Sequence, residues 1–183
     1  EERFEIVSQI PSISAKSLDP KQIAMLLANP ATTNPLYLTV ALEELRGFGS
    51  FEKLNERIRS FPQTGGEKGL DELFLQVIER LERELGQGTV YSTLSSIATS
   101  RSGLSEPELT EFLNRIMLGQ EAVTERSGEM LVTLRQLRPY LFRRGPYVDF
   151  YHRNLYKAVR QRYLRDDVRM GINHALAEYF LSK

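Results

Sequence analysis

Apolar residues recur every three to four positions over most of this chain, which predicts a mainly helical protein. Only one stretch near the C-terminal end alternates in the manner of strands. The helices predicted from this pattern cover residues 2–10, 19–29, 34–46, 50–60, 70–86, 89–99, 105–117, 129–137, 153–164 and 169–181.

Two of these helices carry strong start signals. Asp19 precedes Pro20 and is followed by Gln22 at the third helical position, which predicts a capping box. Asn34 and Pro35 repeat the cap and the first-turn proline at the next helix. Apolar residues surround that second helix on most sides, so we expect it to be buried.

A glycine-rich segment separates two groups of helices. Residues 63–69 contain three glycines and no apolar side chain, which is typical of a linker. We therefore expect a helical domain over residues 1–64 and a second domain over residues 65–183.

The second domain follows the order of a winged helix-turn-helix. Ser105 and Glu108 predict a capping box at its third helix. Two strand-like runs in residues 139–151 flank Arg144-Gly145, which indicates a β-hairpin. The expected fold is a small helical bundle followed by a winged-helix domain, with residues 129–137 in the recognition-helix position and the hairpin as the wing.

The end of the hairpin leads into a helix at His152. Residues 149–151 continue the strand pattern, and the helical pattern begins at Arg153. Backbone amides at a helix start lack intrahelical partners and attract anions. His152 is therefore a candidate nucleotide sensor or a helix-capping residue.

Composition excludes several kinds of site. The 183 residues contain no cysteine and only two histidines, His152 and His174, so neither disulfides nor a zinc site is expected. No apolar run is long enough to cross a bilayer, and the N-terminal residues do not form a signal-peptide pattern. We expect a cytoplasmic protein without a membrane partner.

Net charge is zero, but charge is unevenly distributed. Residues 70–128 hold 10 acidic and 5 basic residues, whereas residues 129–165 hold 9 basic and 2 acidic ones. The basic stretch predicts an acidic partner, which is nucleic acid, a phosphate or an acidic face of the same protein. A solvated helix face is the alternative.

Motifs for catalysis are missing from the chain. It has no phosphate loop of the GxxxxGK[ST] type, no apolar strand ending in paired carboxylates for magnesium, and no GxSxG elbow for a nucleophile. We expect no catalytic residues, no metal site and no enzymatic activity from this chain alone.

Several segments resemble a known protein class. Residues 31–54, including NPLYL, and residues 148–159, VDFYHRNLYKAV, are similar in order and spacing to the region C-terminal to the nucleotide-binding core of STAND-class AAA+ NTPases, the NACHT and NB-ARC relatives. Residues 70–82 and 97–113 also resemble helices of that region.

The resemblance implies a regulatory lid. In that family a helical domain and a winged-helix domain close over ADP or ATP, with magnesium, bound by a core that this chain lacks. It implies that the nucleotide-binding core of the same polypeptide is the partner, that the full-length protein is an NTPase acting as a signal-transduction switch, and that it forms a homo-oligomer on activation.

The same resemblance implies two nucleotide contacts. Asn34, Pro35 and Leu36 match the family's proline-containing motif, which packs against adenine. His152 matches the winged-helix histidine that contacts the β-phosphate of ADP. Arg153 departs from the Met-His-Asp form of NB-ARC members, because a basic residue replaces the acid.

Two other functions remain open from the sequence. Arg135 and Arg138 in the recognition helix region, and Arg143 and Arg144 at the wing tip, are candidate DNA-phosphate contacts. That helix is strongly apolar and offers few side chains for base edges. A protein-interaction module with an acidic neighbour is the third interpretation.

Overall fold

The computed structural model describes residues 2–9, 18–46, 51–118 and 132–183. Contacts between residues divide the chain into two compact units, Glu1–Val77 and Ile78–Lys183. The division falls within one helix, whereas the sequence predicted a boundary between residues 64 and 65. Within the described residues no helix has the length and apolar character needed to cross a membrane.

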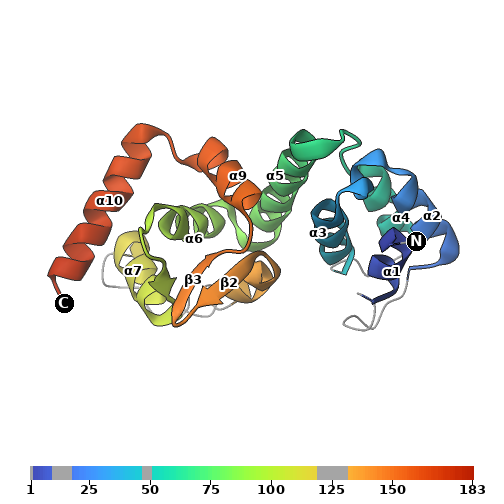
Figure 1. Cartoon of the computed structure of the whole chain (residues 1–183). Coiled ribbons are helices and arrows are strands. Elements are labelled where there is room, and N and C mark those ends of the chain that lie inside the picture. The colour runs from blue at the N-terminus through green and yellow to red at the C-terminus, as the bar shows by residue number, and fades with distance from the viewer. Residues whose placement is uncertain (1, 10–17, 47–50, 119–131) are drawn as a thin grey trace. The chain divides into compact units, whose positions relative to one another are not determined.

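The first unit is helical (Figure 1). Its elements are α1 (Glu2–Gln9), α2 (Pro20–Ala28), the short 3-10 helix η2 (Pro30–Thr33), α3 (Pro35–Arg46), α4 (Phe51–Ser60) and the start of α5 (Gly66–Leu85). The predicted capping box at α2 is confirmed: Asp19 Oδ1 accepts from the Gln22 amide at 2.7 Å, and Gln22 Oε1 accepts from the Asp19 amide at 3.1 Å. Residues 47–50, which follow the helix predicted over residues 34–46, lie outside the described part of the chain.

Helix α3 is buried on several sides, as predicted. Its Tyr37 hydroxyl donates to the Pro62 carbonyl at 2.5 Å, which ties α3 to the turn after α4. Burial raises the pKa of Tyr37 to about 12. The sequence did not reveal that Glu44 is also buried, where it accepts from Arg57 Nη2 of α4 at 2.9 Å.

The second unit combines helices with a small sheet (Figure 1). Its elements after α5 are α6 (Gln87–Thr99), β1 (Leu104–Ser105), α7 (Glu106–Leu118), a helical segment at residues 132–137, the 3-10 helix η3 (Arg138–Tyr140), β2 (Leu141–Arg144), β3 (Tyr147–Phe150), α9 (Arg153–Tyr163) and α10 (Asp166–Leu181). The capping box of Ser105 and Glu108 at the start of α7 is confirmed. Residues 129–131 of the predicted recognition helix lie outside the described part.

The predicted hairpin is confirmed, and it belongs to a three-stranded antiparallel sheet. The strand order is β1–β3–β2, and Arg144 pairs with Tyr147 across the turn. The sequence did not predict β1, where Leu104 pairs with Val148. Gly103 precedes β1 with a φ of 82°, and a Cβ there would lie 3.0 Å from the Val148 carbonyl oxygen, so the close approach of β1 to β3 requires glycine.

Helix α6 forms the centre of the second unit and packs against α7, α9, α10 and β3. Its buried positions include Thr93, Ser95 and Ser96, which are small enough to allow close packing from several sides. The hydroxyls of Thr93 and Ser96 donate to carbonyls one turn earlier, at 2.8 Å and 2.7 Å. Two of these three buried hydroxyls are thus satisfied by the helix itself.

Candidate functional site

His152 lies at the strand-to-helix switch that the sequence predicted. It follows β3 after Tyr151 and has an extended backbone, with φ −138° and ψ 139°. Its Nδ1 accepts a hydrogen bond from the Asn154 amide at 3.2 Å, and its carbonyl accepts from the Leu155 amide at 3.1 Å. The interpretation of His152 as a helix cap is therefore confirmed.

The capping contact leaves the other ring nitrogen available. A neutral imidazole whose Nδ1 accepts a hydrogen bond carries its proton on Nε2, so the tautomer follows from the contact with Asn154. Within the described part of the chain, Nε2 of His152 has no hydrogen-bond partner. One side chain can therefore cap α9 and also donate to an acceptor outside the unit.

Helix α9, which carries His152 at its start, is held firmly at its other end. Arg162 donates to both carboxylate oxygens of Glu82 on α5, and the Tyr163 hydroxyl donates to the same carboxylate. The Tyr163 ring also packs edge-on against Tyr91 of α6, with 5.3 Å between centroids. Leu155 and other apolar residues of α9 are buried, so packing and ion pairing together set the position of the helix.

The ionised state of Glu82 is favoured by these contacts. Hydrogen bonding from Arg162 lowers the pKa of Glu82 below its usual value, and partial burial opposes this change. Burial, followed by the hydrogen bond to Glu82, raises the pKa of Tyr163. The cluster therefore holds a charged pair and a neutral phenol at neutral pH.

The predicted adenine contact forms the start of α3. Asn34 Oδ1 accepts from the amides of Leu36, at 3.0 Å, and Tyr37, at 3.4 Å. Pro35 occupies the first helical position and is exposed, whereas Leu36 is half-buried. The cap and the first-turn proline are confirmed, and contact with a nucleotide remains a prediction. These three residues belong to the first unit and His152 to the second.

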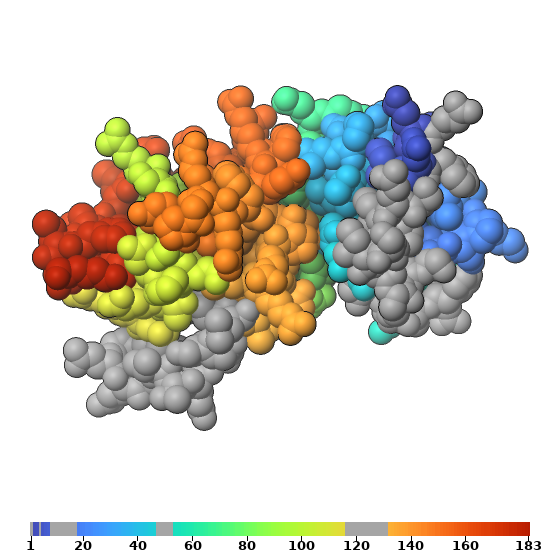
Figure 2. Space-filling model, turned by 60° about the horizontal axis from the view of Figure 1, so that its bottom comes forward, coloured from blue at the N-terminus to red at the C-terminus, as the bar shows by residue number. Residues whose placement is uncertain are grey.

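The four candidate DNA-contacting arginines are all exposed. Arg143 of β2 pairs with Glu106 in the first turn of α7. Among the described residues, Arg135, Arg138 and Arg144 form no ion pair. The hairpin that carries Arg144 is at the surface of the second unit, in orange in Figure 2.

Part of the basic stretch has its acidic partner in the same chain. Arg162 contacts Glu82 at 2.6 Å and Glu79 at 3.4 Å, both on the acidic helix α5. Of the partners predicted for the basic stretch, an acidic face of the same protein is confirmed for Arg162. No local pattern indicates the contact between Arg162 and Glu82, because these residues are 80 positions apart and meet only through packing.

No family model matches the chain, and no solved structure gives a significant match. The chain is similar to several curated proteins, one of which contains a NACHT domain. The chain is 30% identical to NACHT domain- and WD repeat-containing protein 1 of Homo sapiens over 96% of its own length and 12% of that protein. This similarity supports a distant relationship to a NACHT-containing protein.

Two further relatives have other names. A TPR repeat-containing protein of Dictyostelium discoideum is 26% identical over 91% of this chain and 10% of its own length. Telomerase protein component 1 of Mus musculus is 29% identical over 61% of this chain and 4% of its own length. The chain thus spans between 4% and 12% of the length of these three relatives.

Proposed function

We propose that this chain is the regulatory lid region of a STAND-class NTPase of the NACHT and NB-ARC type. It would close over ADP or ATP, with magnesium, held by a nucleotide-binding core in the same polypeptide. It would not be an enzyme by itself, and other copies would be its partners once the nucleotide has been exchanged. Similarity to a NACHT-containing protein over nearly the whole chain supports this assignment.

The second unit would be the winged-helix domain of this lid. Its helices α6 and α7 are followed by the segment at residues 132–137 and then by the hairpin. The short strand β1 lies between the first two helices and joins the hairpin through β3. That order agrees with a winged helix-turn-helix in which β2 and β3 are the wing.

The observation that carries the proposed switch is the geometry of His152. It is separated from β3 by Tyr151, starts a helix that is anchored on α5, and keeps an Nε2 donor that has no hydrogen-bond partner among the described residues. A contact from this donor to a diphosphate would form only in the closed state, so it would shift the equilibrium toward closure. One such charge-assisted hydrogen bond contributes roughly 1.5–3 kcal/mol, enough for a shift of about tenfold or more.

Arg153 adds positive charge at the same place. It is exposed at the first position of α9, where a cation is disfavoured by the helix dipole unless an anion is near. A bound phosphate would offset this cost, so the replacement of the family's acidic residue by Arg153 agrees with an anion at this helix start. Any switching step that depends on the aspartate of the Met-His-Asp form in NB-ARC members would then differ in this chain.

Two substitutions of His152 separate phosphate binding from helix capping. In a protein that joins this chain to its core, His152→Ala removes both the cap and the Nε2 donor. His152→Ser keeps a good cap but has no group that reaches as far as Nε2. Faster ADP release in both variants supports the switch, whereas normal release from His152→Ser would show that capping is the only role.

The residues N-terminal to Glu1 in such a protein provide a second test. The lid assignment requires a GxxxxGK[ST] loop and a following strand that ends in acidic residues. If a longer chain containing this sequence lacks that loop, the assignment is wrong.

A further inference from the structure

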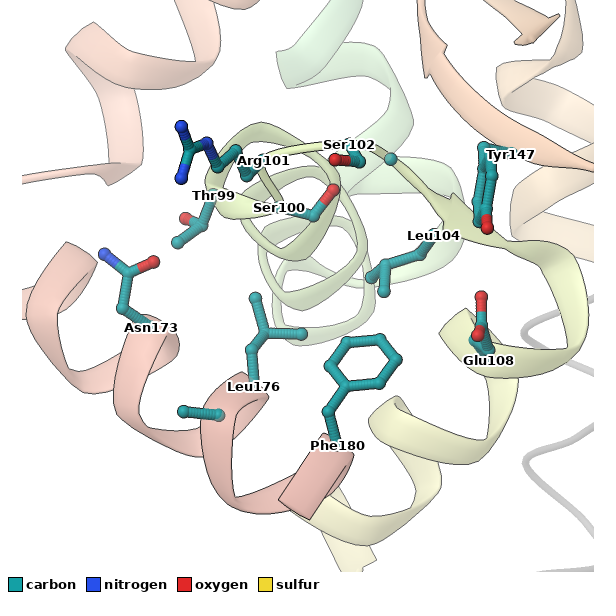
Figure 3. Close-up of a pocket in the computed structure, with 12 residues that line it drawn as sticks. Thr99, Ser100, Arg101, Ser102, Leu104, Glu108, Tyr147, Asn173, Leu176 and Phe180 are labelled. Atoms are coloured by element: carbon teal, nitrogen blue, oxygen red, sulfur yellow. The ribbon is translucent and has the colours of Figure 1, made fainter. Parts of the chain in front are cut away.

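A pocket of about 360 Å³ lies within the second unit (Figure 3). The loop between α6 and β1, the first turn of α7, the start of β3 and one side of α10 contribute to its wall. None of the residues assigned to nucleotide or DNA contact lines it. The pocket is therefore a separate feature of the surface.

One end of the pocket is aromatic. Tyr147 of β3 and Phe180 of α10 both line it, although 39% of Tyr147 and 47% of Phe180 is exposed. Leu104 and Leu176 are buried beside them and form an apolar floor. Large exposed rings over an apolar floor provide the faces on which a flat or cationic group can stack.

The same end contains a carboxylate that can accept a further hydrogen bond. Glu108 Oε2 accepts from the Ser105 amide at 2.9 Å and from the Ser105 hydroxyl at 2.7 Å, whereas Oε1 has no hydrogen-bond partner among the described residues. These hydrogen bonds from Ser105 lower the pKa of Glu108. Its negative charge therefore persists at neutral pH.

The charge around the pocket favours a cation. In Figure 3, Tyr147, Glu108 and Phe180 lie on the same side of the pocket, and the side chain of Arg101 points away from it. An anionic ligand would be repelled at this end.

Helices α7 and α10 already hold one cation in this manner. Nζ of Lys183 lies 4.7 Å from the centroid of the Tyr179 ring and 3.1 Å from Glu111. Glu111 lies one turn after Glu108 on α7, and Phe180 follows Tyr179 on α10. The same pairing of a carboxylate with an aromatic ring thus recurs at the pocket, where no cation of the described chain occupies it.

We propose that this pocket binds an arginine side chain presented by a peptide segment of a partner protein. The guanidinium would stack on Tyr147 or Phe180 and donate to the free oxygen of Glu108. Thr99 and Ser100 also line the pocket, and their hydroxyls are buried without a hydrogen-bond partner among the described residues.

Titration of the 183-residue chain with a capped Gly-Arg-Gly peptide, followed by NMR, tests this site. We expect chemical-shift changes at Tyr147 and Phe180, and binding weaker by at least about fivefold for the peptide in which neutral citrulline replaces arginine. Equal affinity for the two peptides, or no shift at these residues, would overturn the assignment.

Substitution of Glu108 tests whether its carboxylate binds the arginine peptide. Glu108→Gln removes the charge but retains a side chain that completes the capping box with Ser105, so the fold should persist. It should weaken binding of the arginine peptide at least about fivefold, with no effect on the citrulline peptide. Glu178→Gln, an exposed change on α10 outside the pocket wall, is the matched control. An equal loss in both variants would indicate nonspecific attraction and contradict the site.

Discussion

Arg162 on α9 donates two parallel hydrogen bonds to Glu82 on α5, from Nε to Oε1 at 3.0 Å and from Nη2 to Oε2 at 2.6 Å. Paired bonds of this kind combine charge with fixed geometry, so they restrict the rotation of both side chains. The contact lies at the opposite end of α9 from His152. It therefore holds the helix whose start carries the proposed sensor.

Loss of the Glu82 charge should destabilise the second unit. We expect Glu82→Gln to lower the free energy of unfolding by about 1–3 kcal/mol, because Arg162 and Tyr163 lose a charged acceptor. Glu79→Gln is the matched control, since Glu79 lies 3.4 Å from Arg162 and its side chain is 51% exposed, against 10% for Glu82. Urea unfolding followed by circular dichroism measures both, and equal effects would contradict the assigned geometry.

The same pair should make stability depend on pH. The pKa of Glu82 is lowered in the folded state, so its stabilising effect is complete above the ordinary glutamate value of 4.5 and is lost as pH falls through the lower folded value. The stability difference between the native chain and Glu82→Gln should therefore be largest near neutral pH and shrink in acid. Unfolding curves at several pH values test this, and a stability difference that grows in acid would contradict a lowered pKa of Glu82 in the folded state.

The cap at His152 should have a measurable effect on the isolated chain. His152→Ala leaves the Asn154 amide without its acceptor and should cost about 1 kcal/mol. His152→Ser should recover most of that loss, because serine is a favourable N-cap. Thermal unfolding of the three chains gives the ranking, and an alanine variant as stable as the native chain would mean that the Nδ1 contact has no energetic weight.

The buried ion pair of the first unit gives a further prediction. Glu44→Ala leaves the Arg57 guanidinium without its carboxylate in a site where the two side chains are 0% and 10% exposed, which should cost about 3–5 kcal/mol. Replacing both residues, as Glu44→Leu with Arg57→Met, should recover much of this loss. A double-mutant cycle measures the coupling, and simple additivity of the two single substitutions would contradict it.

DNA binding offers a test between the lid and its main alternative. The lid assignment predicts no salt-sensitive binding of duplex DNA at moderate ionic strength. Arg138→Ala with Arg144→Ala removes two exposed arginines that have no ion-pair partner among the described residues, whereas Arg143 is engaged by Glu106. A steep loss of DNA affinity with salt, abolished by this double substitution, would favour the DNA-binding interpretation instead.

Local signals in the sequence were sufficient to predict most helix starts. The caps at Asp19, Asn34 and Ser105 depend on residues within three positions of each other, so their pattern is visible without tertiary structure. The hairpin was predictable for the same reason. His152 could be placed because a strand pattern changes to a helical one at that residue.

Contacts between distant segments were not predictable. Strand β1 has only two residues, too few to show alternation, and it exists because β3 pairs with it. The contact between Glu82 and Arg162 likewise depends on how α9 packs on α5. Helix α5 begins at Gly66, inside the glycine-rich segment expected to be a linker, so composition alone misplaced its start.

The pairing of Leu104 with Val148 has a consequence for how the chain acquires its structure during synthesis. A ribosome releases β1 well before β3, so Leu104 has no strand partner while α7 and the hairpin are still being made. The sheet must therefore close late, after the nascent chain has passed Phe150. Slow translation across this interval would prolong the exposure of an apolar surface to chaperones and to aggregation.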